Sequence, residues 1–521
     1  MRKKVVVLGL DGANFNLLDR WIQGGALPNL EKIRKTGTHG NLRSIIPHES
    51  CPAWKCYSTG KRPDNLGVYW WVYFDWNRKE IIPYTSKSFK SLELWDYLNN
   101  AGFSTGVINM PTTYPPKALK GFMISSFWTP KDENYVNPPS MREELESRYG
   151  YKINPDVHDF SQKEETARCI KELIQMRFDL LIDKIEEDKL DFLHLTIFYI
   201  NTLHHFYWDD DVVKEAWQLI DDNIGRLLQY ENLDLILMSD HGGSRIEAAV
   251  YINNFLQQNN HLSLKYGSAR KYINREALSR LADRLGIKGF LKRIVPDEMI
   301  DQLPTQSTLP RQASFSSSID WENTYAIGAN HGPVYIDRSK FKSEEEYIAF
   351  RNRVADSLMD LKDPRTGETV ILKIFHRDDL YTGKYANLAP DIVAISKQGY
   401  VLTCTIEDEL FKYERQGKWK AKNDLMGIVM GHGPDIKEGY EIADMNIIDL
   451  TPTILHMMGV PIPDELDGKC RTDILKDSCE QSAKDPEFIR METELKPHGD
   501  KDNDMEEEEV KEKLRRLGYL E

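Results

Sequence analysis

The chain of 521 residues lacks long runs of apolar residues, and its six cysteines include no CxxC pair. A transmembrane helix needs about 20 consecutive apolar residues, so we expect no membrane span. Scattered cysteines in a chain of this length are typical of free thiols in a reducing compartment, not of a disulfide framework. The sequence therefore gives no sign of a membrane protein or of a small disulfide-rich secreted protein.

Positive charge is also scarce, because 68 Lys and Arg residues face 82 Asp and Glu residues and the formal net charge is -14. Phosphate backbones and anionic membranes attract clustered Lys and Arg, so we expect no binding to a nucleic-acid duplex or a membrane surface. The N-terminal run "VVVLGL" follows basic residues but stops at Asp11, which is too early for a signal peptide. We therefore expect a cytoplasmic protein.

Four apolar runs have the pattern of buried parallel strands, and amphipathic helical patterns alternate with them. The runs are VVVLGLDG, STGVINM, DFLHLTIFYI and LDLILMSDHGG. Alternation of this kind predicts the α/β class, with a doubly wound, mostly parallel central sheet and helices on both of its faces.

The remaining composition predicts how the chain is divided. We expect a core built from residues 1–258 and 319–475, because further strand-like runs follow residue 319. Residues 259–318 are basic and helical and then rich in Ser, which favours an inserted cap-like region. Residues 476–521 are highly charged, which is typical of a tail, and their last stretch predicts one terminal helix.

Polar residues follow three of the predicted strands, at the edge where ligands bind to doubly wound sheets. Asp11 follows the first strand, residues 201–205 follow the third, and Asp240 with His241 follow the fourth. A carboxylate beside an imidazole suits a divalent metal such as zinc. Ser50, in the turn "PHESCPAW", is expected near the same edge, where a metal can make a hydroxyl nucleophilic.

These motifs resemble the type I phosphodiesterase and nucleotide pyrophosphatase family of the alkaline phosphatase superfamily. The resemblance is carried by VVVLGLDGANFNLLDR, PHESCPAW with STGKRPDNLGV, VINMPTTYPP, MSDHGG and DLTPTILHMMGVPIPDELDG, in this order. It covers nearly the whole chain. It implies an alkaline phosphatase-like fold and an enzyme that hydrolyses a small-molecule phosphoester or pyrophosphate.

The resemblance also implies the catalytic residues. Asp11, Ser50, Asp240 and His241 would hold one divalent metal, most naturally zinc, with manganese or magnesium as alternatives. Ser50 stands where this family commonly has Thr, and its hydroxyl would attack phosphorus to give a covalent phospho-enzyme.

The second metal site that the resemblance implies is altered in this chain. The family has an Asp, a His four residues later and a further His, and these positions are Asn201, His205 and Asn423 here. An amide is a weak ligand for zinc, so we expect one ion and a second site that is degraded or binds substrate. Three histidines are candidates to replace the missing ligands: His204, His331 and His432.

Three functions are compatible with these residues. We favour a phosphoryl hydrolase with one metal, in which Asn201 and Asn423 donate hydrogen bonds to substrate oxygens. The alternative is a degraded family member that binds a phosphate-containing ligand or a protein partner without turnover. A sulfatase-like activity is disfavoured, because Trp54 stands where the sulfatase nucleophile turn has Arg.

Side chains beside Ser50 have competing interpretations. Glu49 is a candidate proton acceptor or, equally, a solvated loop acid. Trp54, Trp70 and Trp71 are candidates to stack on a substrate ring, although we favour a place for them in the core. Lys55 is expected to be exposed on a helix.

Overall fold

The computed structural model describes residues 3–76, 79–84, 88–89, 91–131, 133–157, 159–265, 318–413, 419–490, 511–513 and 517. Most of the predicted cap-like region, residues 259–318, lies outside the described residues, and so does most of the predicted terminal helix. The division of the chain made above therefore stays a prediction for these parts.

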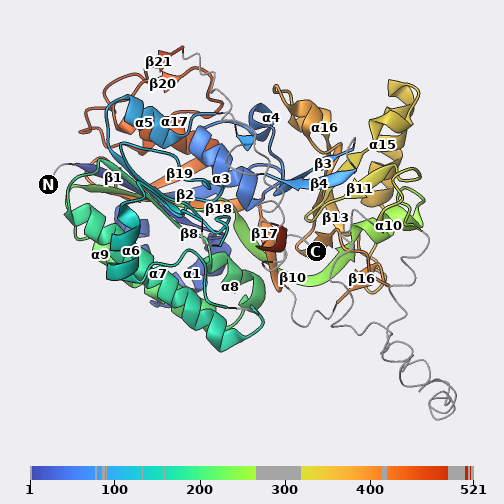
Figure 1. Ribbon diagram of the computed structural model, residues 1–521, viewed down its shortest axis with the longest axis horizontal. Helices are drawn as coiled ribbons and strands as arrows, with labels where there is room; N and C mark the ends of the chain where they lie inside the picture. Colours follow the sequence, from blue (N-terminus) through green and yellow to red (C-terminus); the bar gives the residue numbers. More distant parts are fainter. Residues whose placement is uncertain are drawn as a thin grey trace, which may run out of the picture.

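A nine-stranded sheet forms the centre of the larger lobe (Figure 1). Its order is β19-β2-β18-β9-β1-β8-β5-β6-β7, and neighbours from β9 to β6 run parallel. The bounds are β1 Lys4–Leu10, β2 Thr38–Arg43, β5 Thr105–Ile108, β6 Gly121–Ile124, β7 Val136–Asn137, β8 Phe192–Ile197, β9 Leu233–Met238, β18 Met426–His432 and β19 Tyr440–Asn446. The four runs predicted as parallel strands contain β1, β5, β8 and β9.

Helices cover both faces of this sheet, as the doubly wound prediction requires (Figure 1). One side carries α1 Phe15–Gln23, α2 Pro28–Thr36, α6 Met141–Tyr149, α7 Lys163–Glu186, α8 Ile200–Tyr207 and α9 Asp211–Leu227. The other side carries α3 Ser50–Thr59, α5 Leu94–Asn100 and α17 Leu450–Met457. The predicted fold class is therefore confirmed.

The sequence explains these elements locally. Every residue of β1 is buried, as expected for a central parallel strand covered on both faces. Helix α9 begins where the Asp210 side chain accepts a hydrogen bond from the Val212 N–H, and it buries one apolar stripe that includes Trp217 and Ile224. In the described part of the chain, no helix meets the length and hydropathy that a membrane span requires.

A smaller lobe has its own sheet and its own apolar core. The strand-like runs between residues 324 and 396 do not join the central sheet, because they pair antiparallel with one another in the order β11-β12-β14-β13. The bounds are β11 Ala326–Gly328, β12 Pro333–Ile336, β13 Ile371–His376 and β14 Ile392–Ser396, with helices α10 Ile252–Gln258, α15 Glu344–Met359 and α16 Arg377–Leu380.

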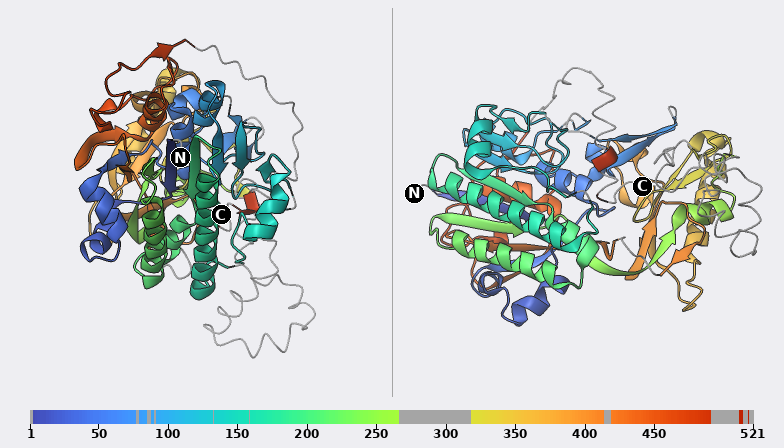
Figure 2. Two further views of the ribbon diagram at one scale, coloured as in Figure 1. Left: turned by 90° about the vertical axis from the view of Figure 1, so that its left-hand side faces the viewer. Right: turned by 60° about the horizontal axis from the view of Figure 1, so that its bottom comes forward.

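Strand β10 carries the chain from the larger lobe to the smaller one (Figures 1 and 2). It spans Gly242–Tyr251 and pairs with β15 Gly399–Thr403, β16 Phe411–Lys412 and β17 Ala421–Asp424. The other short elements are α4 Pro63–Leu66, β3 Val72–Asp75, β4 Glu80–Pro83, β20 Ile462–Pro463 and β21 Phe488–Ile489. Residues from both lobes therefore meet around the start of β10.

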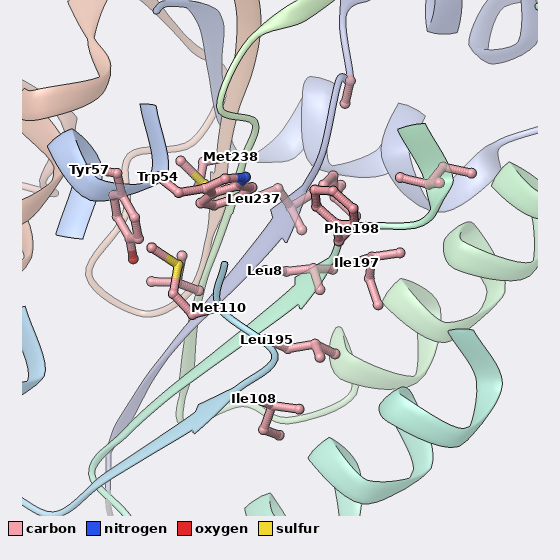
Figure 3. Packing of buried hydrophobic residues seen from close by; sticks show 14 of the residues in the cluster. Leu8, Trp54, Tyr57, Ile108, Met110, Leu195, Ile197, Phe198, Leu237 and Met238 are labelled. Atoms are coloured by element: carbon pink, nitrogen blue, oxygen red, sulfur yellow. The ribbon is translucent and has the colours of Figure 1, made fainter. Parts of the chain in front are cut away.

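The packing of Trp54 fixes helix α3 on the central sheet. Figure 3 shows its indole beside Leu237 and Met238 at the end of β9. Gly9 of β1 leaves room for this ring, because a Cβ at that position would lie 2.5 Å from Trp54 Cη2. The first turn of α3 is thereby held over the carboxyl ends of the strands.

Candidate active site

Three strand ends and one helix start bring the predicted residues together. Strands β9, β1 and β8 are parallel neighbours, so their carboxyl ends share one edge of the sheet. Asp11 directly follows β1, and Asp240 and His241 follow β9 by two and three residues. Ser50 is the first residue of α3. All four side chains are fully buried. We call Asp11, Ser50, Asp240 and His241 the first cluster.

The atoms of the first cluster converge on one point. Donor atoms of Asp11, Asp240 and His241 all lie within 4.8 Å of one another. His241 Nε2 is 3.7 Å from Asp11 Oδ1 and 3.2 Å from Asp240 Oδ2. The same nitrogen is 3.0 Å from Ser50 Oγ. Two carboxylate oxygens, one imidazole nitrogen and one hydroxyl oxygen therefore surround a common centre.

Hydrogen bonds hold the outward atoms of Asp11, Asp240 and His241. The Trp54 indole N–H donates to Asp11 Oδ2 at 2.9 Å, and the Gly12 N–H donates to Asp240 Oδ1 at 3.2 Å. His241 Nδ1 is 2.7 Å from the Gly242 carbonyl, which makes Nδ1 the donor and leaves the Nε2 lone pair toward the centre. Asp11 Oδ1 and Asp240 Oδ2 have no hydrogen-bond partner within the described residues.

The two buried carboxylates of the first cluster favour the binding of a cation. Burial, together with the charge of Asp240, raises the pKa of Asp11 well above its usual value. Burial also raises the pKa of Asp240, against the opposing effect of His241. Two carboxylates with unpartnered oxygens are costly to bury. A divalent cation satisfies both, and two oxygen donors with one imidazole suit zinc.

A second group of polar side chains lies beside the first. It consists of Glu49, Asn201, His205, His331 and Asn423, and we call it the second cluster. Asn201 touches the turn after Asp11, because a Cβ added at Gly12 would lie 2.3 Å from Asn201 Oδ1. Asn423 pairs with Gly243, two residues after His241.

The three predicted residues of the altered second site are all buried here. The His205 ring stacks on Trp419 at 3.5 Å between centroids, and His205 Nδ1 lies 2.9 Å from the Ala421 carbonyl. Burial lowers the pKa of His205 well below its usual value, so this imidazole is neutral at pH 7. Asn201 Nδ2 has no hydrogen-bond partner within the described residues. The structure thus brings Asn201, His205 and Asn423 to the edge that the sequence predicts.

Glu49 and His331 make a contact that the sequence did not predict. Glu49 is fully buried, so the interpretation of a solvated loop acid is wrong. Its Oε1 contacts His331 Nδ1, and its Oε2 accepts a hydrogen bond from Asn423 Nδ2 at 3.3 Å. Burial raises the pKa of Glu49 well above its usual value, and His241 and Asn423 act against this shift. The only sequence signal was an acid directly before Ser50.

The other candidates lie in different places. His204 Nε2 accepts a hydrogen bond from the Trp217 indole at 2.9 Å, and the two rings stack. His204 Nδ1 faces the turn after Asp11, because a Cβ at Gly12 would lie 3.2 Å from it. His432 pairs with Leu235 near the start of β9, at the edge opposite the clusters. Lys55 is buried, and its Nζ lies 2.7 Å from Glu93 Oε1. The prediction that Lys55 is exposed is therefore wrong.

Two further observations complete the surroundings of the clusters. The tryptophans beside Ser50 are core residues, since Trp54, Trp70 and Trp71 are all at most 2% exposed. A separate cavity of about 980 Å³ is lined by residues of α4, β3 and β12, and neither cluster contributes to its wall.

Comparison with known families identifies this arrangement. The family model of type I phosphodiesterases and nucleotide pyrophosphatases matches residues 5–423, a span from β1 to Asn423 that contains both clusters. The chain belongs to this family. It is therefore a hydrolase of the phosphodiesterase and pyrophosphatase type, as the sequence resemblance implies. Among curated proteins, no sequence matches the chain closely enough to count as a relative.

Solved structures with the same fold include members of this family. Murine ectonucleotide pyrophosphatase / phosphodiesterase 5 is 15% identical, with a TM-score of 0.51, over 91% of this chain and 100% of that chain. The human protein of the same name is 15% identical with a TM-score of 0.50 over the same shares. A murine structure of an inactive variant in complex with AMP has a TM-score of 0.51 at 15% identity. At this identity the likeness establishes the fold alone.

Proposed function

We propose that this protein is a phosphoryl hydrolase that uses one divalent cation and Ser50 as its nucleophile. The cation would be held by Asp11, Ser50, Asp240 and His241, with zinc as the first choice and manganese or magnesium as alternatives. The single observation that carries the proposal is the convergence of Asp11 Oδ1 and Asp240 Oδ2, both without hydrogen-bond partners, on His241 Nε2 and Ser50 Oγ.

The residues of the first cluster fit a cation because their inward atoms are already in position. Asp11, Asp240 and His241 each use their other polar atom for a hydrogen bond to the protein, so their inward atoms are held in place before a cation arrives. When bound, a divalent cation there stabilises the Ser50 oxygen in its deprotonated, nucleophilic form. Ser50 Oγ would then bond to phosphorus in line with the leaving group, giving a phosphoserine that water hydrolyses.

The second cluster supports one cation rather than two. Among the described residues, Asp11, Asp240 and His241 are the only group of His, Cys, Asp or Glu ligands spaced for a metal. Asn201 and Asn423 are neutral, and Asn201 Nδ2 is a buried donor without a partner in the described chain. Such a donor would bind an oxygen of the phosphoryl group, where developing charge is stabilised best in a dry site.

The substrate class follows from this chemistry. A single phosphoryl group next to Ser50 is compatible with a small phosphodiester or pyrophosphate. The structural neighbour bound to AMP makes nucleoside phosphates the first compounds to test. The net charge of -14 supports a small substrate over a nucleic-acid duplex.

The test combines metal analysis with turnover. Elemental analysis of purified protein should find one divalent ion per chain, and the protein should hydrolyse bis-p-nitrophenyl phosphate. Ser50→Ala should abolish hydrolysis, whereas Ser58→Ala, the same change on the same helix, should retain it. Two ions per chain would show that the second cluster binds metal after all. No ion and no turnover with added zinc, manganese or magnesium would favour the alternative of a non-catalytic binding protein.

A further inference from the structure

Glu49 and His331 come from different lobes and meet directly beside the nucleophile. Glu49 precedes Ser50 at the start of α3, in the larger lobe. His331 lies in the turn between β11 and β12, in the smaller lobe, almost three hundred residues later in the chain. Glu49 is fully buried and the His331 side chain is 7% exposed, so their contact is made almost without water. Such an acid–imidazole contact is costly to bury and therefore calls for an explanation.

The turn that carries His331 is fixed at three places. The His331 N–H donates to the Leu402 carbonyl at 2.8 Å, and the Asn330 side chain accepts from the Cys404 N–H at 2.7 Å. Gly332 has φ +110, and a Cβ there would lie 1.9 Å from the Ala394 carbonyl oxygen. His331 itself has φ 65, a left-handed conformation that non-glycine residues seldom adopt.

Two tryptophan rings also lie near the imidazole of His331. Its ring centre is 5.7 Å from Trp70 and 5.9 Å from Trp419. Glu49 contacts Nδ1, so Nε2 is the nitrogen that points away from the acid. Glu49 is itself anchored by Asn423, one of the two positions where the family has a second metal ligand. Glu49 therefore lies against one nitrogen of the imidazole and is itself held by Asn423, so the acid and the ring are fixed next to each other.

We propose that His331, oriented by Glu49, is the general acid and base of this enzyme and acts where its relatives have a second metal ion. The inference rests on the proposed function, since it assigns a role in the cycle of Ser50. His331 is the catalytic residue in this proposal, and Glu49 is a positioning residue.

The reaction has two half-reactions, and in this proposal His331 Nε2 donates a proton in the first and accepts one in the second. In the first, Ser50 Oγ bonds to phosphorus, the bond to the leaving oxygen breaks, and the protonated His331 gives its proton to that oxygen. In the second, a water oxygen bonds to phosphorus, the water proton passes to His331, and the bond to Ser50 Oγ breaks with its electron pair returning to Ser50. The oxygen of Ser50 begins and ends deprotonated, and the imidazole begins and ends protonated.

The variants His331→Ala, His331→Gln and Glu49→Gln test this assignment, with His432→Ala as the matched control from the opposite sheet edge. With bis-p-nitrophenyl phosphate the leaving group needs no proton, so His331→Ala should still release a first burst of nitrophenolate. Water attack should then slow by about 10²- to 10⁴-fold. Intact-mass spectrometry should find the nitrophenyl phosphoryl group accumulating on Ser50, and added imidazole should restore turnover of the Ala variant.

Further readouts separate catalysis from folding. Metal content and thermal midpoint of His331→Gln should equal those of the wild type, and Glu49→Gln should lower kcat with little change in KM. The role of His331 would be overturned if His331→Ala turned over substrate at the wild-type rate. It would also be overturned if the variant lost activity and the metal ion together. In either case Ser50→Ala still tests the nucleophile separately. If the wild-type protein itself never acquires the phosphoryl group on Ser50, the proposed function fails and this inference fails with it.

Discussion

The two clusters lie side by side at one sheet edge, yet they differ in the charge of their side chains. The first cluster has two buried carboxylates whose inward oxygens have no partner in the described residues, so it needs a cation. The second cluster has two neutral amides and a single buried acid that already contacts His331 and Asn423. The difference is one of charge, because the first cluster has two carboxylates and the second has neutral amides at two of its positions.

The largest expected effect comes from removing a ligand of the first cluster. Asp240→Asn should lower kcat/KM by on the order of 10³-fold, because it removes a charge that holds the cation. Without metal, the variant should be at least as stable as the wild type, since the repulsion between Asp11 and Asp240 is gone. Thermal unfolding with and without a chelator measures both effects. A chelator should lower the midpoint of the wild type only, and equal shifts in both proteins would contradict the assignment.

A second test tries to make the two clusters alike. The double variant Asn201→Asp with Asn423→His restores the ligand types that the family has at these positions, so the metal content should rise from one ion to two per chain. Elemental analysis measures this directly, and Asn423→His alone serves as the control that should stay at one. A wild-type protein that already binds two ions would refute the comparison.

A smaller effect should follow from loosening the first cluster without touching its ligands. Trp54→Phe keeps most of the packing but removes the N–H that holds Asp11 Oδ2. Metal affinity should fall by about 10- to 100-fold, as for other groups that orient a ligand. Titration with a competing chelator measures the affinity. Trp95→Phe, the same change at a buried tryptophan of α5, should leave it unchanged, and an equal fall in both variants would point to packing alone.

The smallest effect concerns the space that Trp54 occupies. Gly9→Ala should destabilise the fold by about 1–3 kcal/mol, because its Cβ would meet the indole of Trp54. Thermal or urea unfolding measures the change. Combined with Trp54→Phe, the cost should largely disappear, since the shorter ring avoids the new methyl group. Additive costs in the double variant would show that the close approach seen here does not control stability.

The central sheet was predictable because its signals are local. Continuous apolar runs such as the one ending at Leu10 become buried parallel strands, and the polar residue that follows each run falls at the ligand-binding edge. Asp11, Asp240 and His241 were placed together for this reason. Lys55 was misjudged, because its ion pair with Glu93 joins two helices and leaves no mark in the neighbouring sequence.

The smaller lobe was harder to foresee. Its strands are short apolar runs like those of the central sheet, and nothing in such a run says which sheet it will join. Only the course of β10, which leads the chain away from the central sheet, separates the pairings of β11 to β14 from those of β18.

The sequence by itself determined the fold class, the family and the residue types of the first cluster, because strand ends and short motifs are encoded in adjacent positions. It also determined that Asn201 and Asn423 are poor metal ligands. The tertiary structure alone decided that Glu49 is buried and that His331 reaches it from the other lobe. The physical reason is that this contact depends on how two separately built sheets pack, which no local pattern of residues specifies.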